Sequence, residues 1–247
     1  MSNGRSGGRR QGLLSWLGGH DLATLVLVFL LAGAVWGFAE LADEVFEGET
    51  GGFDRWLILA LRNPADIADP LGPAWLEEMG RDFTALGGVG VLTLLTLAAA
   101  GFLLLRRQGH AALLLLAAVG GGILLSSLMK HGFSRPRPEL VPYGSHIYTS
   151  SFPSGHSMMS AVTYLTLGAL LARAEARRRI KAYLLILAVL LTFSVGLSRV
   201  YLGVHWPTDV LAGWTAGAAW ALACWLAARW LQRRGRVEGP GGAPDST

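Results

Sequence analysis

The chain has 247 residues, of which 52% are hydrophobic and 15% are charged, and its formal net charge is +4. Soluble domains carry about 25% charged residues, so this composition excludes a soluble enzyme, a disordered chain and a disulfide-rich scaffold. Cys224 is the single cysteine, which excludes an internal disulfide and a thiolate metal cluster. The composition is that of a membrane protein.

Six stretches without Asp, Glu, Lys or Arg predict membrane-spanning helices, and together they predict an all-α integral membrane protein with one six-helix bundle. Their lengths are close to the roughly 20 residues that a helix needs to cross the hydrocarbon core, whereas barrel strands would alternate polar and apolar residues. The predicted spans are residues 22–39, 83–105, 108–129, 154–172, 182–198 and 210–228. Ala32, Gly33 and Ala34 resemble a small-residue cleavage site, so a signal peptide is an alternative for the first span.

The spans divide the chain into three parts. We expect an N-terminal segment over 1–21, the membrane domain over 22–230 and a flexible tail over 231–247. The first two spans are joined by an outer segment, 40–82, which contains no motif that indicates a particular chemistry. Within it, residues 53–62 place apolar side chains at helical spacing, which predicts a short helix in the membrane interface. An ordinary ordered loop fits that pattern equally well.

The positions of Lys and Arg predict the orientation, because cytoplasmic connections carry an excess of both. Fourteen of the 21 basic residues fall in the N-terminal segment, in the links after the second and fourth spans, and in the tail. The outer segment carries eleven acidic residues against only Arg55, Arg62 and Arg81. Both termini are therefore expected in the cytoplasm, and the outer segment on the opposite side.

Ionisable residues gather at the predicted outer ends of spans three to six. They are Lys130, Arg135 and Arg137 after the third span, His156 at the start of the fourth, Arg199 at the end of the fifth, and His205 and Asp209 at the start of the sixth. Each one alone has an ordinary interpretation, such as a snorkelling side chain or an acid that matches a helix dipole. Four helix ends with such residues at one membrane face indicate a functional site.

These residue types are suited to phosphate chemistry. Arginine pairs with phosphate oxygens and lysine adds positive charge. Ser154, Gly155 and His156 begin a predicted helix, whose free backbone N–H groups favour an anion. Asp209 can orient His205 as a nucleophile, while His156 protonates the leaving oxygen. This chemistry requires neither a metal nor another cofactor.

The spacing of these residues resembles the three-part signature of the type 2 phosphatidic-acid phosphatase and vanadium haloperoxidase superfamily. The matching motifs are Lys130-x6-Arg137-Pro138, Pro153-Ser154-Gly155-His156 and Ser198-Arg199-x5-His205-x3-Asp209. They cover residues 130–209, about a third of the chain, and every motif position matches. The six-span layout is similar to that of the bacterial integral-membrane lipid phosphatases of this superfamily.

The resemblance implies a role for each matching residue. The expected phosphate-binding residues are Lys130, Arg137, Ser154, Gly155 and Arg199. The expected catalytic residues are His156 as general acid, His205 as the nucleophile that forms a phosphohistidine, and Asp209 as its orienting partner. Outside the signature, Arg135 is interpreted as a headgroup contact, and His20, His110, His131 and His146 as surface histidines.

The resemblance also implies a metal-independent lipid phosphate or diphosphate phosphatase. Family members of this kind act on undecaprenyl diphosphate, phosphatidylglycerol phosphate, phosphatidic acid or the lipid A phosphate, and the compact architecture favours the first two. We expect a multi-pass protein of the bacterial inner membrane with a periplasmic active site. Its expected partners are lipid substrates in the bilayer, not nucleic acid.

Four alternatives remain open. A lipid phosphotransferase would use the same motifs and differ only in its acceptor. A vanadate haloperoxidase is disfavoured because those relatives are soluble. A transporter or non-catalytic anion-binding membrane protein is disfavoured because transporters show internal repeats, and none is evident. A metal hydrolase ligated by His156, His205 and Asp209 would have to hold a cation beside three cationic side chains.

Overall fold

The computed structural model describes residues 22–140 and 150–233. These residues form eight helices and one two-stranded hairpin. In chain order the elements are α2 (Leu22–Glu47), α3 (Gly51–Leu59), β1 (Arg62–Asn63), β2 (Asp66–Pro70), α4 (Ala74–Leu86), α5 (Val89–Leu105), α6 (Gly109–Gly132), α7 (Gly155–Ala174), α8 (Arg178–Tyr201) and α9 (Pro207–Arg233). The predicted N-terminal segment, the tail beyond residue 233, His20 and His146 lie outside the described residues.

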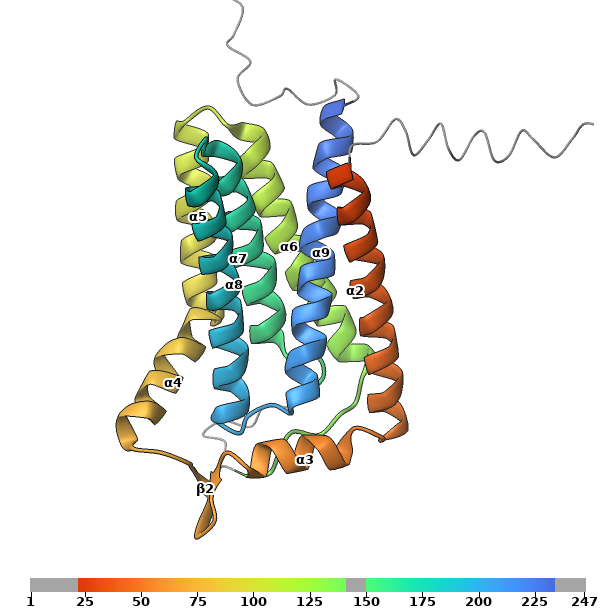
Figure 1. Cartoon of the computed structure of the whole chain (residues 1–247), viewed down its shortest axis with the longest axis vertical. Coiled ribbons are helices and arrows are strands. Elements are labelled where there is room, and N and C mark those ends of the chain that lie inside the picture. The colour runs from red at the N-terminus through yellow and green to blue at the C-terminus, as the bar shows by residue number, and fades with distance from the viewer. Residues whose placement is uncertain (1–21, 141–149, 234–247) are drawn as a thin grey trace, which may run out of the picture.

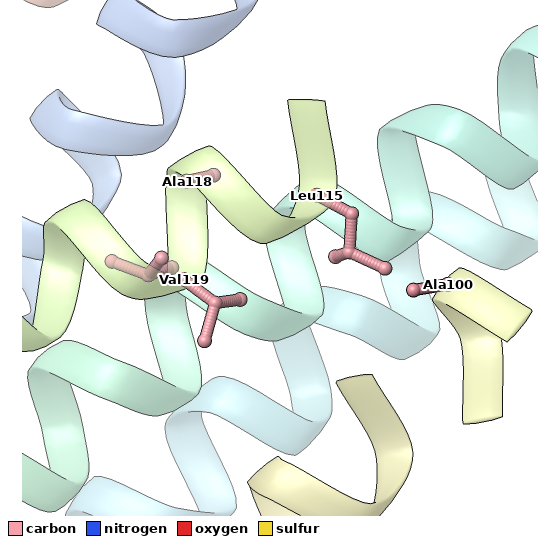
Figure 2. Close-up of a cluster of buried hydrophobic side chains, with 5 residues drawn as sticks. Ala100, Leu115, Ala118 and Val119 are labelled. Carbon is pink, nitrogen blue, oxygen red and sulfur yellow. The ribbon is translucent and has the colours of Figure 1, made fainter. Parts of the chain in front are cut away.

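The long helices lie side by side as a bundle (Figure 1). At its centre α7 packs against α6, α8 and α9, and α2 packs along the other side of α9. Apolar side chains close the space between α5, α6 and α7, where Ala100, Leu115, Ala118 and Val119 are buried together (Figure 2). Five of the six predicted spans correspond to one long helix each, and the second, 83–105, covers the end of α4 and all of α5. The expectation of an all-helical membrane fold is confirmed.

The predicted number of six spans is not confirmed. Among the described residues, α2, α6, α8 and α9 are each long and apolar enough to cross a membrane. Helices α4 and α5 meet that test as a pair bent by 48°, which makes a fifth candidate. The central helix α7 is not among these candidates, and it carries buried hydroxyl side chains, among them Ser157, Ser160 and Thr163.

The helices extend beyond the predicted spans at several ends. The sixth span was predicted to begin at residue 210, but α9 begins at Pro207, which places Asp209 in its first turn. The third span was predicted to end at 129, but α6 runs to Gly132 and includes Lys130. A charge-free run ends at the first ionisable residue, whereas the helical backbone continues its hydrogen bonding through that residue.

Small residues allow the central helices to pack closely. A Cβ atom on Gly217 of α9 would lie 2.5 Å from the backbone oxygen of Met158 in α7. A Cβ atom on Gly213 would lie 2.6 Å from the backbone oxygen of Ser154. Only glycine fits at such distances, which is the packing typical of helices in lipid. The start of α7 is thereby packed closely against the first three turns of α9.

The outer segment covers one end of the bundle. Helix α3 lies across this end beneath α9, and the β1–β2 hairpin and α4 follow it (Figure 1). The helix predicted over 53–62 is observed over Gly51–Leu59, and Arg62 lies in β1 instead. The segment therefore lies next to the helix ends that carry the predicted site.

Candidate functional site

The predicted site residues lie at four neighbouring helix ends. Lys130 is in the last turn of α6, and Arg199 is in the last turn of α8. His156 is in the first turn of α7, and His205 precedes α9. His156 lies within electrostatic range of four neighbouring side chains, which are those of Arg199, His205, Lys130 and Arg137. The structure therefore brings the cations and both histidines into one cluster.

The start of α7 combines a capped helix N-terminus with a nearby ammonium group. Ser154 is its N-cap, and the Ser154 hydroxyl accepts hydrogen bonds from the Ser157 N–H at 3.4 Å and the Ser157 hydroxyl at 3.0 Å. The Ser154 N–H donates to the Asp209 carbonyl at 2.9 Å. A Cβ atom on Gly155 would lie 3.3 Å from Lys130 Nζ, so the ammonium sits over the glycine. Positive charge and the helix N-terminus thus face the same space.

The end of α8 positions the loop that carries His205. Val204 N–H donates to the Arg199 carbonyl at 3.1 Å and Gly203 N–H to the Val200 carbonyl at 2.9 Å. These two bonds form a Schellman motif, which requires a left-handed residue after the helix. Gly203 supplies it with a φ of +73°. The chain therefore leaves α8 in a fixed direction, two residues before His205.

His205 is buried between three partners. Its Nε2 lies 3.0 Å from Nη1 of Arg137, and its Nδ1 lies 3.4 Å from both Asp209 Oδ2 and Ser151 Oγ. Burial lowers the pKa of His205 to about 4, although the hydrogen bond and charge of Asp209 act in the opposite direction. The imidazole is therefore neutral at neutral pH.

Asp209 is completely buried and fully hydrogen-bonded. Its Oδ2 accepts from the Ser151 hydroxyl and, at 2.9 Å, from the Trp206 N–H. The second bond reaches back from the third helical position to the N-cap backbone, as the acid of a capping box does. Its Oδ1 forms an ion pair of 2.7 Å with Arg135 Nη1. Asp209 therefore both starts helix α9 and faces His205.

Two of the cations are directed by neighbouring segments. Arg199 Nη1 donates to Thr84 Oγ1 of α4 at 3.0 Å. Arg137 Nη1 also donates to the Val204 carbonyl at 3.0 Å. Helix α4 and the loop after α8 thus orient guanidinium groups toward the cluster around His156.

Sequence reasoning missed several residues of this site. Ser151 and Thr84 lie outside the motifs, and no local sequence pattern marks either of them. The interpretation of Arg135 as a headgroup contact is not what the structure shows. Its guanidinium pairs instead with Asp209 and with Asp54 of α3, at 2.7 and 2.6 Å.

The remaining described histidines are exposed, as predicted. His110 lies at the start of α6, and His131 lies near its end with Nδ1 2.7 Å from the Ser127 carbonyl. A cavity of about 480 Å³ lies at the other end of the bundle, lined by Arg173, Trp225, Arg229 and Gln232. It contains no predicted site residue.

Comparison with known proteins identifies related sequences. The family model described as the PAP2 superfamily matches residues 111–233. Phosphatidylglycerophosphatase B of Bacillus subtilis is 37% identical over 145 residues, which are 58% of this chain and 70% of that protein. An undecaprenyl-diphosphatase of Sulfolobus acidocaldarius is 40% identical over 68 residues, which are 28% of this chain and 29% of that protein.

The fold is also similar to a solved structure. A transmembrane PAP2-type phosphatidylglycerolphosphate phosphatase from Bacillus subtilis superimposes with a TM-score of 0.71 and 28% sequence identity. The match covers 83% of this chain and 98% of that protein. The residues matched by the family model include all three motifs.

Proposed function

The chain belongs to the PAP2 superfamily, and from that membership we propose that it is a metal-independent lipid phosphate and diphosphate phosphatase that works through a phosphohistidine. Its named relatives are membrane phosphatases. The observation that supports the mechanism best is the group that faces Nε2 of His205.

The contact with Arg137 supports His205 as the nucleophile. A guanidinium has donors only, so the 3.0 Å contact requires His205 Nε2 to be the acceptor. The ring proton is then assigned to Nδ1, on the side of Asp209 and Ser151. Nε2 keeps the lone pair that a nucleophile needs.

In the first step a phosphate group binds between Lys130, Arg137 and Arg199. The guanidinium of Arg137 moves its hydrogen bonds from His205 to the phosphate oxygens, which releases the lone pair. Nε2 of His205 attacks phosphorus, and a P–N bond forms as the P–O bond to the lipid breaks. His156 gives its proton to the leaving oxygen, while the cations stabilise the charge on the equatorial oxygens.

In the second step water hydrolyses the intermediate. His156, now unprotonated, takes a proton from the water as its oxygen attacks phosphorus. The P–N bond breaks, its electron pair returns to Nε2, and inorganic phosphate leaves. Asp209 holds the ring throughout, because Trp206 N–H, Ser151 and Arg135 fix its carboxylate.

The proposal includes six membrane spans, with α4 and α5 together as the second and α7 as the fourth. Buried among α6, α8 and α9, α7 does not need the apolar surface of a lipid-facing helix. Basic residues at the ends of α5 and α7 and the start of α8 support a cytoplasmic location for that end. The site then faces the periplasm of a bacterial inner membrane, and both termini are cytoplasmic.

The favoured substrates are phosphatidylglycerol phosphate and undecaprenyl diphosphate. The names of two relatives support this choice. The motif residues contact phosphate and not the lipid tail, so both substrates suit one site.

Phosphate release in detergent tests the proposal. Wild-type protein, His205→Ala and the control His131→Ala are assayed with EDTA on both lipids and on phosphatidic acid. We expect release by wild type and His131→Ala and none by His205→Ala. No release on any lipid would contradict a hydrolase and lead to assays with a lipid acceptor. Activity that EDTA abolishes and zinc restores would indicate a metal hydrolase instead.

A further inference from the structure

We propose that the outer segment is a clamp that holds the two helix ends flanking His205, and that Asp54 is a positioning residue for the His205–Asp209 pair. The inference rests on the proposed function of this site. The clamp has two contact points, Asp54 in α3 and Arg62 in β1. Both side chains are buried, at 1% and 3% exposure, although they come from a connecting segment.

Asp54 caps the N-terminus of α9 in place of the residue that precedes the helix. The residue before Pro207 is Trp206, whose side chain has no acceptor for the free N–H groups of the first turn. Asp54 Oδ1 accepts from the Thr208 N–H at 2.9 Å, and Oδ2 accepts from the Thr208 hydroxyl at 2.6 Å. The carboxylate also matches the positive end of the helix dipole. Helix α3 thus fixes the first turn of α9, in which Asp209 lies.

Asp54 also determines which nitrogen of the Arg135 guanidinium pairs with Asp209. Arg135 Nη2 bonds Asp54 at 2.6 Å, which leaves Nη1 to bond Asp209 at 2.7 Å. Trp206 lies beneath the guanidinium, 5.8 Å from ring centroid to Cζ. Without the charge of Asp54, both nitrogens of the guanidinium can pair with Asp209, the geometry that arginine favours with a carboxylate. Asp209 would then turn toward Arg135 and away from His205.

Arg62 holds the other helix end. Its Nη2 donates to the Tyr201 carbonyl, the last residue of α8. A cation at this point matches the negative end of the helix dipole. A Cβ atom on Gly203 would lie only 2.6 Å from the same nitrogen. The Schellman turn and the Arg62 side chain therefore pack closely against each other.

The two contacts enclose the loop that carries the nucleophile. Residues 202–206 connect the end of α8, held by Arg62, to the start of α9, held by Asp54. The two anchors are eight residues apart in one short segment, and each has the sign of charge that its helix end favours. A site of this kind depends on neighbours that hold its groups in place. The clamp therefore sets the direction of His205 relative to Asp209.

Asp54→Asn tests the clamp by removing charge while keeping an oxygen for Thr208. Phosphate release should show kcat reduced by roughly ten- to a hundredfold, the effect of losing one charged hydrogen bond, with KM little changed. Asp66→Asn, an exposed acid of the same segment, is the matched control and should keep the wild-type kcat. Arg62→Ala should also lower kcat, and Arg62→Lys should restore part of it.

A second measurement separates the clamp from the proposed function. The ring signals of His205 in the nuclear magnetic resonance spectrum should shift in Asp54→Asn and stay in place in Asp66→Asn, whether or not the protein turns over lipid. A wild type without phosphatase activity would overturn the proposed function. The His205 ring signals would still test whether Asp54 positions His205. Unchanged His205 signals and a wild-type kcat in folded Asp54→Asn would overturn the clamp. If Asp54→Asn does not fold, the same criteria apply to Arg62→Ala.

Discussion

The imidazole of His205 is 2% exposed, and this burial keeps it neutral over most of the pH range. We expect its ring signals to titrate with a midpoint near pH 4, well below the 6.5 of a free imidazole. The assignment comes from the signal that is lost in His205→Asn. A midpoint near 6.5 would mean that the ring is not buried in the protein.

The same shift predicts how stability depends on pH. The pKa of His205 is about 4 when folded and 6.5 when free, so the unfolded chain binds more protons between these values. The stability that the neutral ring contributes is therefore complete above about pH 6.5 and is lost as the pH falls toward 4. Wild type should lose more thermal stability over this interval than His205→Asn. Parallel losses would contradict the shift.

Asp209 is expected to contribute to kcat more than to binding. Asp209→Asn places an amide where Arg135, Ser151 and Trp206 N–H all donate, so the side chain can no longer hold the His205 Nδ1 proton. By analogy with the orienting acid of serine proteases, kcat should fall by about 10⁴-fold. Steady-state kinetics on folded protein measures this. A kcat near that of wild type would remove Asp209 from the mechanism.

At the scale of elements, the contact between α7 and α9 holds the two histidine-bearing ends together. Gly217→Ala inserts a methyl group 2.5 Å from the Met158 carbonyl, and overpacking of this kind costs about 1–3 kcal/mol. We expect a lower Tm and reduced phosphate release. Gly120→Ala in α6 is the matched control, since nothing lies within 4 Å of its Cβ position. Equal Tm values for the two variants would show that the contact is not tight.

There is a physical reason why the sequence predicts the helices and the position of the motif residues at their ends. A charge-free run of about 20 residues has few stable structures in lipid other than a helix, and the motif residues stand out as charges at helix ends. Asp54 and Thr84 could not be predicted this way. Asp54 contacts Thr208 across 154 residues, and Thr84 contacts Arg199 across 115. Such pairs leave no local pattern.

The bend between α4 and α5 is another feature that a hydropathy pattern does not reveal. Residues 83–105 contain no charge, so they read as one straight span. Gly87 and Gly88 interrupt it. A Cβ atom on Gly87 would lie 2.4 Å from Val195 and 3.4 Å from the Cβ of His156. The break therefore fits closely against the start of α7, beside the candidate site.

For the whole molecule, the proposed orientation predicts which ends are accessible from outside the cell. In a Cys224→Ala background, Asp66→Cys lies in the outer hairpin and Gln108→Cys in the link between α5 and α6, and both positions are exposed. A membrane-impermeant maleimide should label Asp66→Cys in intact spheroplasts, and Gln108→Cys only after lysis. The opposite labelling pattern would show that the protein has the opposite orientation in the membrane, with the site facing the cytoplasm.

The covalent intermediate is the central claim, and trapping it is the most direct test. Purified wild type, His205→Ala and His131→Ala would be mixed with substrate labelled in the transferred phosphate, quenched in alkali within one turnover, digested and sequenced by mass spectrometry. We predict label on His205 in wild type and in His131→Ala, and none in His205→Ala. Phosphate release by the wild type without labelled His205, or label on another residue, would contradict the mechanism.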